Sequence, residues 1–303
     1  MLRLYDLPPP PATRRFRRTI PGRGWAKLRR YAHRGFEIMT APVQDRVTTR
    51  EGVVFGTGGG RELRCDIYEP PPAIKNGIGV LLIHGGGWSS GDRSQLKGYG
   101  VLLGRRGYTC IASEYRLTGE ALWPAQIEDV KCAVRYVRAN AADLGIDPDR
   151  LVISGNSAGG HLSLMAGGAT PASFEGVGGN SNVSSSVAAV ISFYPPTGLD
   201  KREWGGMPAL FGKGADVQTM KGASPLEYAA ADFPPTLLIQ GNADDVVPAA
   251  EATAMYDALH AKGAPVELHM FANQPHAFDS DPKLGRLCSE LMLSFLDRYI
   301  LKR

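Results

Sequence analysis

The chain of 303 residues is 43% hydrophobic and 21% charged, an ordinary balance for a globular protein with a buried core. It contains no apolar run near the ~20 residues needed to cross a bilayer, and its basic N-terminus lacks the apolar stretch of a signal peptide. We therefore expect no transmembrane segment and a cytoplasmic location. The net charge of +4 is uneven, because residues 1–34 hold ten Lys and Arg residues and one Asp.

The first 50 residues are interpreted as a basic arm, ahead of a single domain over residues 51–303. After a run of four prolines, apolar residues recur at helical spacing at Trp25, Leu28, Tyr31, Ala32 and Phe36. Such a helix could cap a site, pair with another subunit or lie on a membrane surface, or the arm could dock on its own acidic domain. The arm carries no aromatic-interleaved recognition motif, so we expect no nucleic-acid partner.

From about Val53 the pattern changes to apolar strands that alternate with amphipathic helices. One helix is predicted from the spacing of apolar residues between Trp123 and Val137, and the last from the spacing between Leu284 and Leu296. This alternation predicts an α/β fold with a mostly parallel central sheet flanked by helices, in which ligands bind beyond the carboxyl ends of the strands. The strand-like runs are residues 78–85, 107–115, 150–155, 187–194, 235–241 and 266–271.

The four cysteines are scattered through these elements without C-x-x-C spacing. They fit reduced, mostly buried thiols better than a disulfide framework or a zinc site, and no metal site is expected. They are Cys65, Cys110, Cys132 and Cys288.

Two segments match G-x-S-x-G, the pattern of a serine nucleophile on a sharp turn, and they contain Ser89 and Ser157. A nucleophile elbow requires a strand that leads into the turn and a helix that leaves it. Ser157 has both, since "RLVIS" precedes it and "AGGHLSLMAG" follows. Ser89 follows three glycines and a tryptophan instead. Ser157 is therefore the candidate nucleophile.

A serine hydroxyl needs a base, and the base needs a carboxylate that orients it. Downstream of an elbow these follow in the order acid, then histidine, each on a loop after a strand. His276 lies in the loop after the last predicted strand, and the loop before it contains both Asp244 and Asp245. The residues alone leave that pair open. The glycine-rich run "HGGGW" follows a strand upstream of the elbow and suits an oxyanion loop, because its backbone N–H groups are unobstructed.

Together these motifs resemble the α/β-hydrolase carboxylesterases, nearest to the hormone-sensitive-lipase-like (bacterial type IV) esterases and the feruloyl- and acetyl-esterase-like group. The likeness runs from about Val53 to the C-terminus, through "HGGGWSSGD", "GNSAGGHL", "GNADDVVP" and "PHAF". It implies an α/β-hydrolase fold and a triad of Ser157, His276 and Asp244, the last selected by its distance from the loop glycine. It also implies oxyanion N–H groups from Gly86, Gly87 and Ala158, with His84 bracing their loop.

Three positions depart from the pattern of these esterases. Gln240 replaces a histidine, Asn156 replaces the commoner aspartate before the nucleophile, and Glu114 stands where the lipase-like branch has an aspartate. None removes a group that the proposed chemistry needs.

The resemblance implies a small-molecule ester as substrate, cleaved through an acyl-enzyme without cofactor or metal. Short-chain acyl or aryl esters are expected; feruloyl or acetyl esters of carbohydrates and an amide, as in a formamidase, are the alternatives. A non-catalytic receptor on this scaffold is disfavoured because His276 is present. A homodimer is left open. Residues proposed for the substrate pocket are Trp88, Trp204, Met207, Leu210 and Phe211, and the last four could instead belong to a small helix packed on the body.

Overall fold

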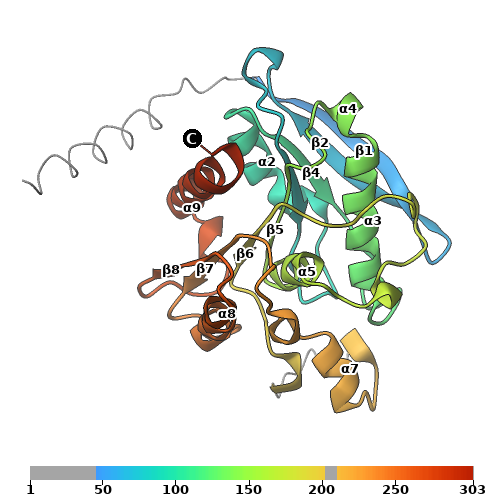
Figure 1. Cartoon of the computed structure of the whole chain (residues 1–303), viewed down its shortest axis with the longest axis vertical. Helices are drawn as coiled ribbons and strands as arrows, with labels where there is room; N and C mark the ends of the chain where they lie inside the picture. The colour runs from blue at the N-terminus through green and yellow to red at the C-terminus, as the bar shows by residue number, and fades with distance from the viewer. Residues whose placement is uncertain (1–45, 202–209, 303) are drawn as a thin grey trace, which may run out of the picture. The chain divides into compact units, whose positions relative to one another are not determined.

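The computed structural model describes residues 46–201 and 210–302, and these contain an eight-stranded sheet (Figure 1). The strand order is β1-β2-β4-β3-β5-β6-β7-β8. Five neighbouring pairs are parallel, namely β3–β4, β3–β5, β5–β6, β6–β7 and β7–β8. This is the pattern predicted from the alternation of strands and helices. The strands are β1 (Thr48–Gly58), β2 (Arg61–Glu69), β3 (Gly79–Ile83), β4 (Thr109–Ser113), β5 (Leu151–Asn156), β6 (Ala189–Phe193), β7 (Thr236–Gly241) and β8 (Val266–Phe271).

The helices of the described residues fill most connections between the parallel strands. They are α2 (Lys97–Gly104), α3 (Ala125–Ala139), α4 (Ala141–Leu144), α5 (Ala158–Gly167), α7 (Val217–Gly222), α8 (Ala249–Lys262) and α9 (Pro282–Leu296). Short 3-10 turns are η2 (Pro72–Ile74), η3 (Arg93–Leu96), η4 (Ala172–Phe174), η5 (Leu199–Lys201), η6 (Pro225–Tyr228) and η7 (Phe278–Ser280), and a π-helical turn, η8 (Asp297–Leu301), ends the fold.

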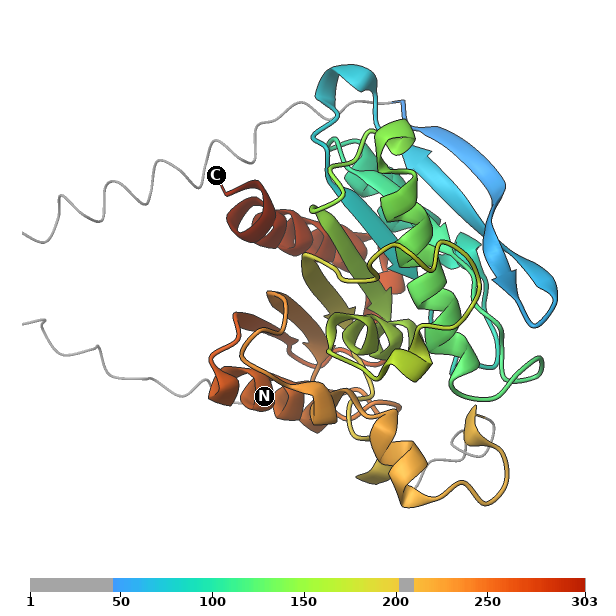
Figure 2. The same ribbon diagram turned by 45° about the vertical axis from the view of Figure 1, so that its right-hand side comes forward.

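The β1–β2 hairpin forms one edge of the sheet and is antiparallel, as is the β2–β4 pairing (Figure 2). Its turn consists of two glycines with positive φ, Gly59 at 58° and Gly60 at 86°. Both central residues of a tight hairpin turn of this kind need such angles, and glycine adopts them at little cost. The sequence pattern predicted a mostly parallel sheet, and this hairpin supplies the antiparallel part.

Alternating side chains of each central strand face two separate hydrophobic cores. In β3, Leu81 and Ile83 pack into the core under α3, α5 and α8, while Val80 and Leu82 pack into the core under α2 and α9. The period of two in a strand requires this division when both faces of a sheet are covered. Each fully buried aliphatic side chain contributes about 1.5–3 kcal/mol, so the covered sheet is a rigid base for loops at its edge.

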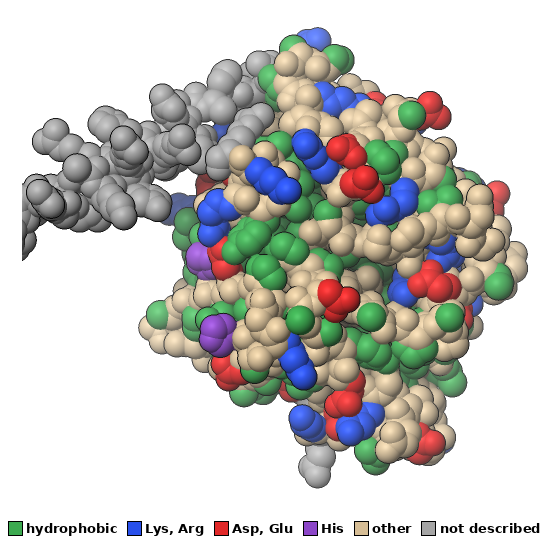
Figure 3. All heavy atoms as spheres, in the orientation of Figure 1, with side chains coloured by type: hydrophobic (Ala, Val, Ile, Leu, Met, Phe, Trp, Pro, Cys, Tyr) green, Lys and Arg blue, Asp and Glu red, His purple; other side chains and the backbone are tan. Residues whose placement is uncertain are grey.

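The four cysteines are free and buried, as predicted. Burial raises the pKa of the Cys65 thiol to about 12. On the face shown in Figure 3, basic and acidic side chains are interspersed. The basic arm and its apolar helical spacing lie almost entirely outside the described residues, so the division at residue 50 stays a prediction.

Candidate active site

The strand–turn–helix around Ser157 is sharp and closely packed. Strand β5 ends at Asn156 and helix α5 begins at Ala158, so the turn is Ser157 alone, with φ 54° and ψ −120°. A side chain on Gly159 would put its Cβ 2.1 Å from the carbonyl oxygen of Ile83, so only glycine lets α5 pass this close to β3. The strained backbone lifts Ser157 away from the strand at the carboxyl end of the sheet.

His276 lies beside this serine although it is 119 residues further along the chain. Its Nε2 is 3.0 Å from the Ser157 Oγ. Its Nδ1 is 2.7 Å from the Asp244 Oδ2. The imidazole is 18% exposed and the Asp244 side chain is 0% exposed, so solvent reaches the serine end of the chain of contacts and not the carboxylate end. The structure thus brings together the three predicted triad residues.

The Asp244 carboxylate is held by several donors. Oδ1 accepts hydrogen bonds from the backbone N–H groups of Val246 at 2.9 Å and Val247 at 2.7 Å. Burial raises the pKa of Asp244, but the hydrogen bonds from His276 and from these two N–H groups outweigh burial and bring the pKa below its ordinary value. An ionised carboxylate can only accept, so the proton of His276 resides on Nδ1 and Nε2 faces the serine hydroxyl as an acceptor.

Asp245, the neighbour that the residues alone could not exclude, is exposed. It is Asp244, not Asp245, that accepts the hydrogen bond from His276 Nδ1. The Asp and His loops are also joined directly, since the Ala243 N–H donates to the Gln274 carbonyl at 3.0 Å and the Asn273 N–H donates to the Asn242 side chain at 2.6 Å. These bonds fix the distance between the carboxylate and the imidazole.

The glycine loop after β3 is a tight turn. The carbonyl of Gly86 accepts from the N–H groups of Ser89 and Ser90 at 3.2 and 3.0 Å, and Gly86 has φ 113°. Within the described residues the N–H groups of Gly86 and Gly87 have no backbone acceptor, which leaves them available as donors. Ala158, the third predicted donor, is the first residue of α5, where helical N–H groups lack an intrahelical partner.

His84 is buried beneath this loop and braces it. Its Nδ1 is 2.8 Å from the Gly85 carbonyl and its ring stacks on Tyr115 with 4.3 Å between centroids. The Tyr115 hydroxyl donates to the His84 carbonyl at 3.1 Å. Burial lowers the pKa of His84, so its ring is neutral at ordinary pH.

Ser89, the other G-x-S-x-G serine, lies in the glycine loop and its hydroxyl donates to the Gly86 carbonyl at 3.4 Å. Trp88 beside it was predicted for the substrate pocket. Its indole is 1% exposed and donates from Nε1 to the Nδ1 of His161 at 3.2 Å. The indole therefore packs against the elbow helix, and a role in the pocket stays a prediction.

Two further residues predicted for the substrate pocket lie in the segment between β6 and β7. Leu210 is fully buried, and its carbonyl accepts from the Trp123 N–H at 2.9 Å. Phe211 is partly buried with its ring 6.3 Å from that of Trp123. These two residues pack on the body, and a role for them in the substrate pocket stays a prediction. Trp204 and Met207 lie outside the described residues.

Sequence reasoning missed two residues that contact the triad. Gln240 is fully buried and its Nε2 donates to Asp244 Oδ2 at 3.2 Å; it was noted only as a departure from the esterase pattern. Tyr194, which directly follows β6, lies edge-on to His276 with 4.6 Å between ring centroids. Its position at the carboxyl end of a central strand is the signal that could have identified it.

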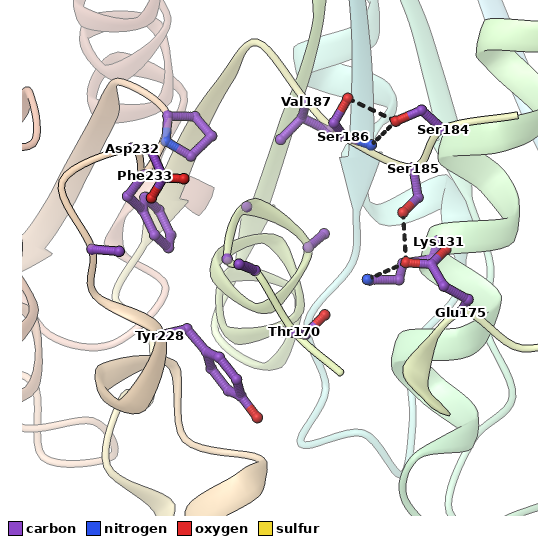
Figure 4. Close-up of a pocket in the computed structure, with 16 residues that line it drawn as sticks. Lys131, Thr170, Glu175, Ser184, Ser185, Ser186, Val187, Tyr228, Asp232 and Phe233 are labelled. Atoms are coloured by element: carbon purple, nitrogen blue, oxygen red, sulfur yellow. Dashed lines mark hydrogen bonds and ion pairs between the residues drawn. The ribbon is translucent and has the colours of Figure 1, made fainter. Parts of the chain in front are cut away.

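A separate cavity of about 370 Å³ lies at the other end of the sheet (Figure 4). Val187 and Phe233, at its wall, come shortly before β6 and β7, so the cavity is at the amino ends of these strands. Across from Phe233 the figure places Lys131 and Glu175, which form an ion pair. Because the triad is at the carboxyl ends, this cavity is not part of the candidate active site.

Comparisons with known proteins assign the family. Residues 65–259 match the BD-FAE family model, so the chain belongs to the BD-FAE family. Esterase LipQ of Mycobacterium tuberculosis is 32% identical over 78% of this chain and 60% of its own length. Carboxylesterase NlhH of the same species is 32% identical over 69% of this chain and 65% of its own length. The chain thus spans about 54–60% of the length of the first three curated relatives it matches.

Solved structures give the same fold. A truncated carbohydrate esterase from gut microbiota superposes with a TM-score of 0.72 at 26% identity, over 84% of this chain and 99% of that one. Apo esterase 2 of Thermogutta terrifontis superposes with a TM-score of 0.73 at 28% identity, over 82% of this chain and 94% of that one. The fold is therefore the α/β-hydrolase fold, as predicted.

Two features are absent from the residues that the structure describes. None of the helices there is both long and apolar enough to span a membrane. No cluster of three or more His, Cys, Asp or Glu side chains there is arranged to hold a metal ion.

Proposed function

We propose that this chain is a serine carboxylesterase that uses Ser157 as nucleophile, His276 as general base and Asp244 as the carboxylate that orients the base. The observation that carries the proposal is the unbroken run of contacts from the buried Asp244 through His276 to the Ser157 hydroxyl, at 2.7 and 3.0 Å. The names of the relatives and structural neighbours, all of them esterases or ester hydrolases among those cited, support the same reaction class.

In the first step Ser157 attacks the ester carbonyl carbon while Nε2 of His276 takes the hydroxyl proton. The ionised Asp244 stabilises the resulting imidazolium through Nδ1. His276 then returns the proton to the leaving alcohol as the C–O bond breaks. Water, deprotonated by the same imidazole, next attacks the acyl-enzyme and releases the acid.

The N–H groups of Gly86, Gly87 and Ala158 are the proposed donors to the oxyanion. Gly86 and Gly87 belong to the glycine loop and both have positive φ. Ala158 is at the N-terminus of α5, where the helix dipole favours negative charge. Such donors act on charge that appears in the transition state, and one of them is typically worth about 3 kcal/mol. Ground-state binding of the ester gains less from them.

Short-chain acyl esters are the proposed substrates. Thermogutta terrifontis esterase 2, a structural neighbour at 27–28% identity, has been solved with propionate and with butyrate bound. A second candidate, a short acyl ester on a carbohydrate, is favoured by the likeness to the gut-microbiota carbohydrate esterase.

A test of the active centre uses the Ser157→Ala variant and an organophosphate. We expect the variant to lose a factor of roughly 10³ to 10⁶ in kcat on p-nitrophenyl butyrate, because the nucleophile and base act as a unit. Paraoxon should phosphorylate the unaltered chain at Ser157, located by mass spectrometry of the peptides. The matched control is Ser89→Ala, which should retain activity and be labelled normally. Near-normal turnover of Ser157→Ala would refute the assignment.

A panel of esters tests the substrate proposal. A p-nitrophenyl chain-length series, acetylated xylan, methyl ferulate and N-formylkynurenine are compared by kcat/KM. The proposal requires the highest values for short acyl esters. A preference for N-formylkynurenine over every ester would instead assign an amide-directed hydrolase on the same residues.

A further inference from the structure

We infer that Tyr194 is a positioning residue for His276, held in place by hydrogen bonds to Asp279 and from Asn156. The inference rests on the proposed function, because it concerns how the proposed base is oriented. It adds three side chains to the site that neither the motifs nor the comparisons assign.

The phenol of Tyr194 connects two active-site loops. Its hydroxyl donates to the Asp279 Oδ1 at 2.6 Å and accepts from the Asn156 Nδ2 at 3.3 Å. Asn156 immediately precedes Ser157, and Asp279 is three residues after His276. One hydroxyl therefore joins the loop of the nucleophile to the loop of the base.

The ring of Tyr194 is the part that contacts the imidazole. Its centroid is 4.6 Å from that of His276 and the two planes are inclined by 63°. Triad contacts at both imidazole nitrogens fix two directions in the ring plane, and a ring packed against the imidazole limits its tilt out of that plane. Aromatic pairs in this geometry also attract each other beyond the effect of burial.

The backbone of Tyr194 is constrained to make this contact. Its N–H donates to the Ile239 carbonyl at 2.7 Å, and the preceding carbonyl, of Phe193, accepts from the Ser157 N–H at 2.9 Å. Tyr194 has φ 36°, a left-handed value that an aromatic residue adopts only with backbone strain. This strained backbone and its two hydrogen bonds thus keep a fully buried tyrosine beside His276.

Hydrogen bonds extend the network beyond the Tyr194 hydroxyl to α2. Asp279 Oδ2 also accepts from the Tyr99 hydroxyl of α2 at 2.9 Å. On this side lies a cavity of about 480 Å³, whose wall includes Asn156, Tyr194, Asp279 and Tyr99. Because open space adjoins these side chains, loss of the two hydrogen bonds of the Tyr194 hydroxyl leaves its ring room to shift against His276. Loss of the Tyr99 hydroxyl leaves both of those bonds in place.

The test compares Tyr194→Phe with Tyr99→Phe. Each removes one phenol hydroxyl that donates to Asp279, so the two should lose similar thermal stability. Only Tyr194→Phe frees a ring that contacts His276. We expect its kcat on p-nitrophenyl butyrate to fall about tenfold with KM within a factor of about two, because small misplacement of a catalytic group slows chemistry more than binding. Tyr99→Phe should keep kcat within a factor of about two.

Two further variants keep the inference testable whatever the stability of the first. Asp279→Asn removes the charge that anchors Tyr194 and should reduce kcat to a similar extent as Tyr194→Phe. Tyr194→Leu removes the ring and should reduce kcat more. In ¹⁵N-histidine-labelled protein, the His276 resonances should shift or broaden in the Tyr194 variants and stay unchanged in Tyr99→Phe.

The outcomes separate this inference from the proposed function. Equal kcat for Tyr194→Phe and Tyr99→Phe, or unchanged His276 resonances in Tyr194→Leu, would overturn the positioning role while Ser157 still reacted with paraoxon. Failure of paraoxon to label Ser157 in the unaltered chain would instead remove the proposed function itself.

Discussion

At the scale of single residues, Gln240 is the position where a departure from the esterase pattern acquires a physical account. It is fully buried, and its Nε2 lies 3.0–3.2 Å from three acceptors that share its two N–H donors: the Asp244 carboxylate and the Gly241 and Val247 carbonyls. A histidine at this position would titrate beside the carboxylate, whereas an amide donates at every pH. Gln240 therefore supports the ionised state of Asp244 without a charge of its own.

Replacement of Gln240 by leucine should reduce both activity and stability. Three buried acceptors lose a donor, which costs about 1–3 kcal/mol of unfolding free energy, and the loosened carboxylate should lower kcat several-fold. The control is Gln126→Leu: Gln126 is also fully buried and donates to the Arg116 and Ala121 carbonyls, far along the chain from the triad. Urea unfolding and steady-state kinetics should show a stability loss in both variants and a kcat loss in the Gln240 variant alone.

At the scale of elements, the junction of β5 and α5 determines the geometry of the site. The helix starts one residue after the strand and crosses so close to β3 that a Cβ on Gly159 would meet the Ile83 and His84 carbonyl oxygens at 2.1 and 2.6 Å. These carbonyls belong to the backbone of the sheet and of the glycine loop, which cannot move aside independently. The elbow and the proposed oxyanion loop are consequently one packed unit.

Gly159→Ala should therefore disturb both parts together. We expect a loss of stability of about 1–3 kcal/mol, the usual cost of overpacking, and a larger loss of activity because Ser157 and the glycine loop shift relative to each other. Gly98→Ala in α2 is the matched control, since nothing lies within 4 Å of its Cβ position. That change should be neutral or stabilising by up to about 1 kcal/mol. Thermal unfolding and ester turnover distinguish the two; an active, stable Gly159→Ala would contradict the close packing.

The elements were more predictable from sequence than the contacts between them. All six predicted strands are present, and the local strand–turn–helix pattern sufficed to choose Ser157 over Ser89, because an elbow is defined by neighbouring residues. The adjacent glycines Gly59 and Gly60 are a sequence signal for the β1–β2 hairpin turn, although the predicted strands did not include this hairpin. The choice between Asp244 and Asp245 needed the resemblance to known esterases, since both follow the same strand. Tyr194 meets His276 only through the folded sheet, and no short-range pattern marks such a contact.

At the scale of the whole molecule, stability should depend on pH through a histidine buried between elements. His161 of α5 accepts from Trp88 of the glycine loop at Nδ1, and its Nε2 donates to the Ala223 carbonyl at 2.7 Å. The ring thus links the elbow helix, the glycine loop and the end of α7 while it is neutral. Burial lowers the pKa of His161 to about 4. Protonation would leave a charge without a partner in this interior.

The sign of the effect follows from proton binding. In the unfolded chain a histidine takes up its proton near pH 6.5, while folded His161 does so only near pH 4, so between these values the unfolded state binds more protons. Unfolding free energy should thus fall as pH falls through this window, by about 3 kcal/mol from His161 in total. The stabilisation is fully present above pH 6.5.

His161→Gln isolates this contribution, because glutamine can donate and accept but does not titrate. The variant should be less stable than the unaltered chain at pH 7.5, and the difference in unfolding free energy should shrink steadily toward pH 4.5. The control is Gln126→Leu, which removes buried hydrogen bonds but no titratable group, so its difference in unfolding free energy should not change with pH. Urea unfolding across this range measures both. If the difference in unfolding free energy for His161→Gln stayed constant with pH, folded and unfolded His161 would take up the proton at the same pH. The link between the glycine loop, the elbow helix and α7 would then not require a neutral ring.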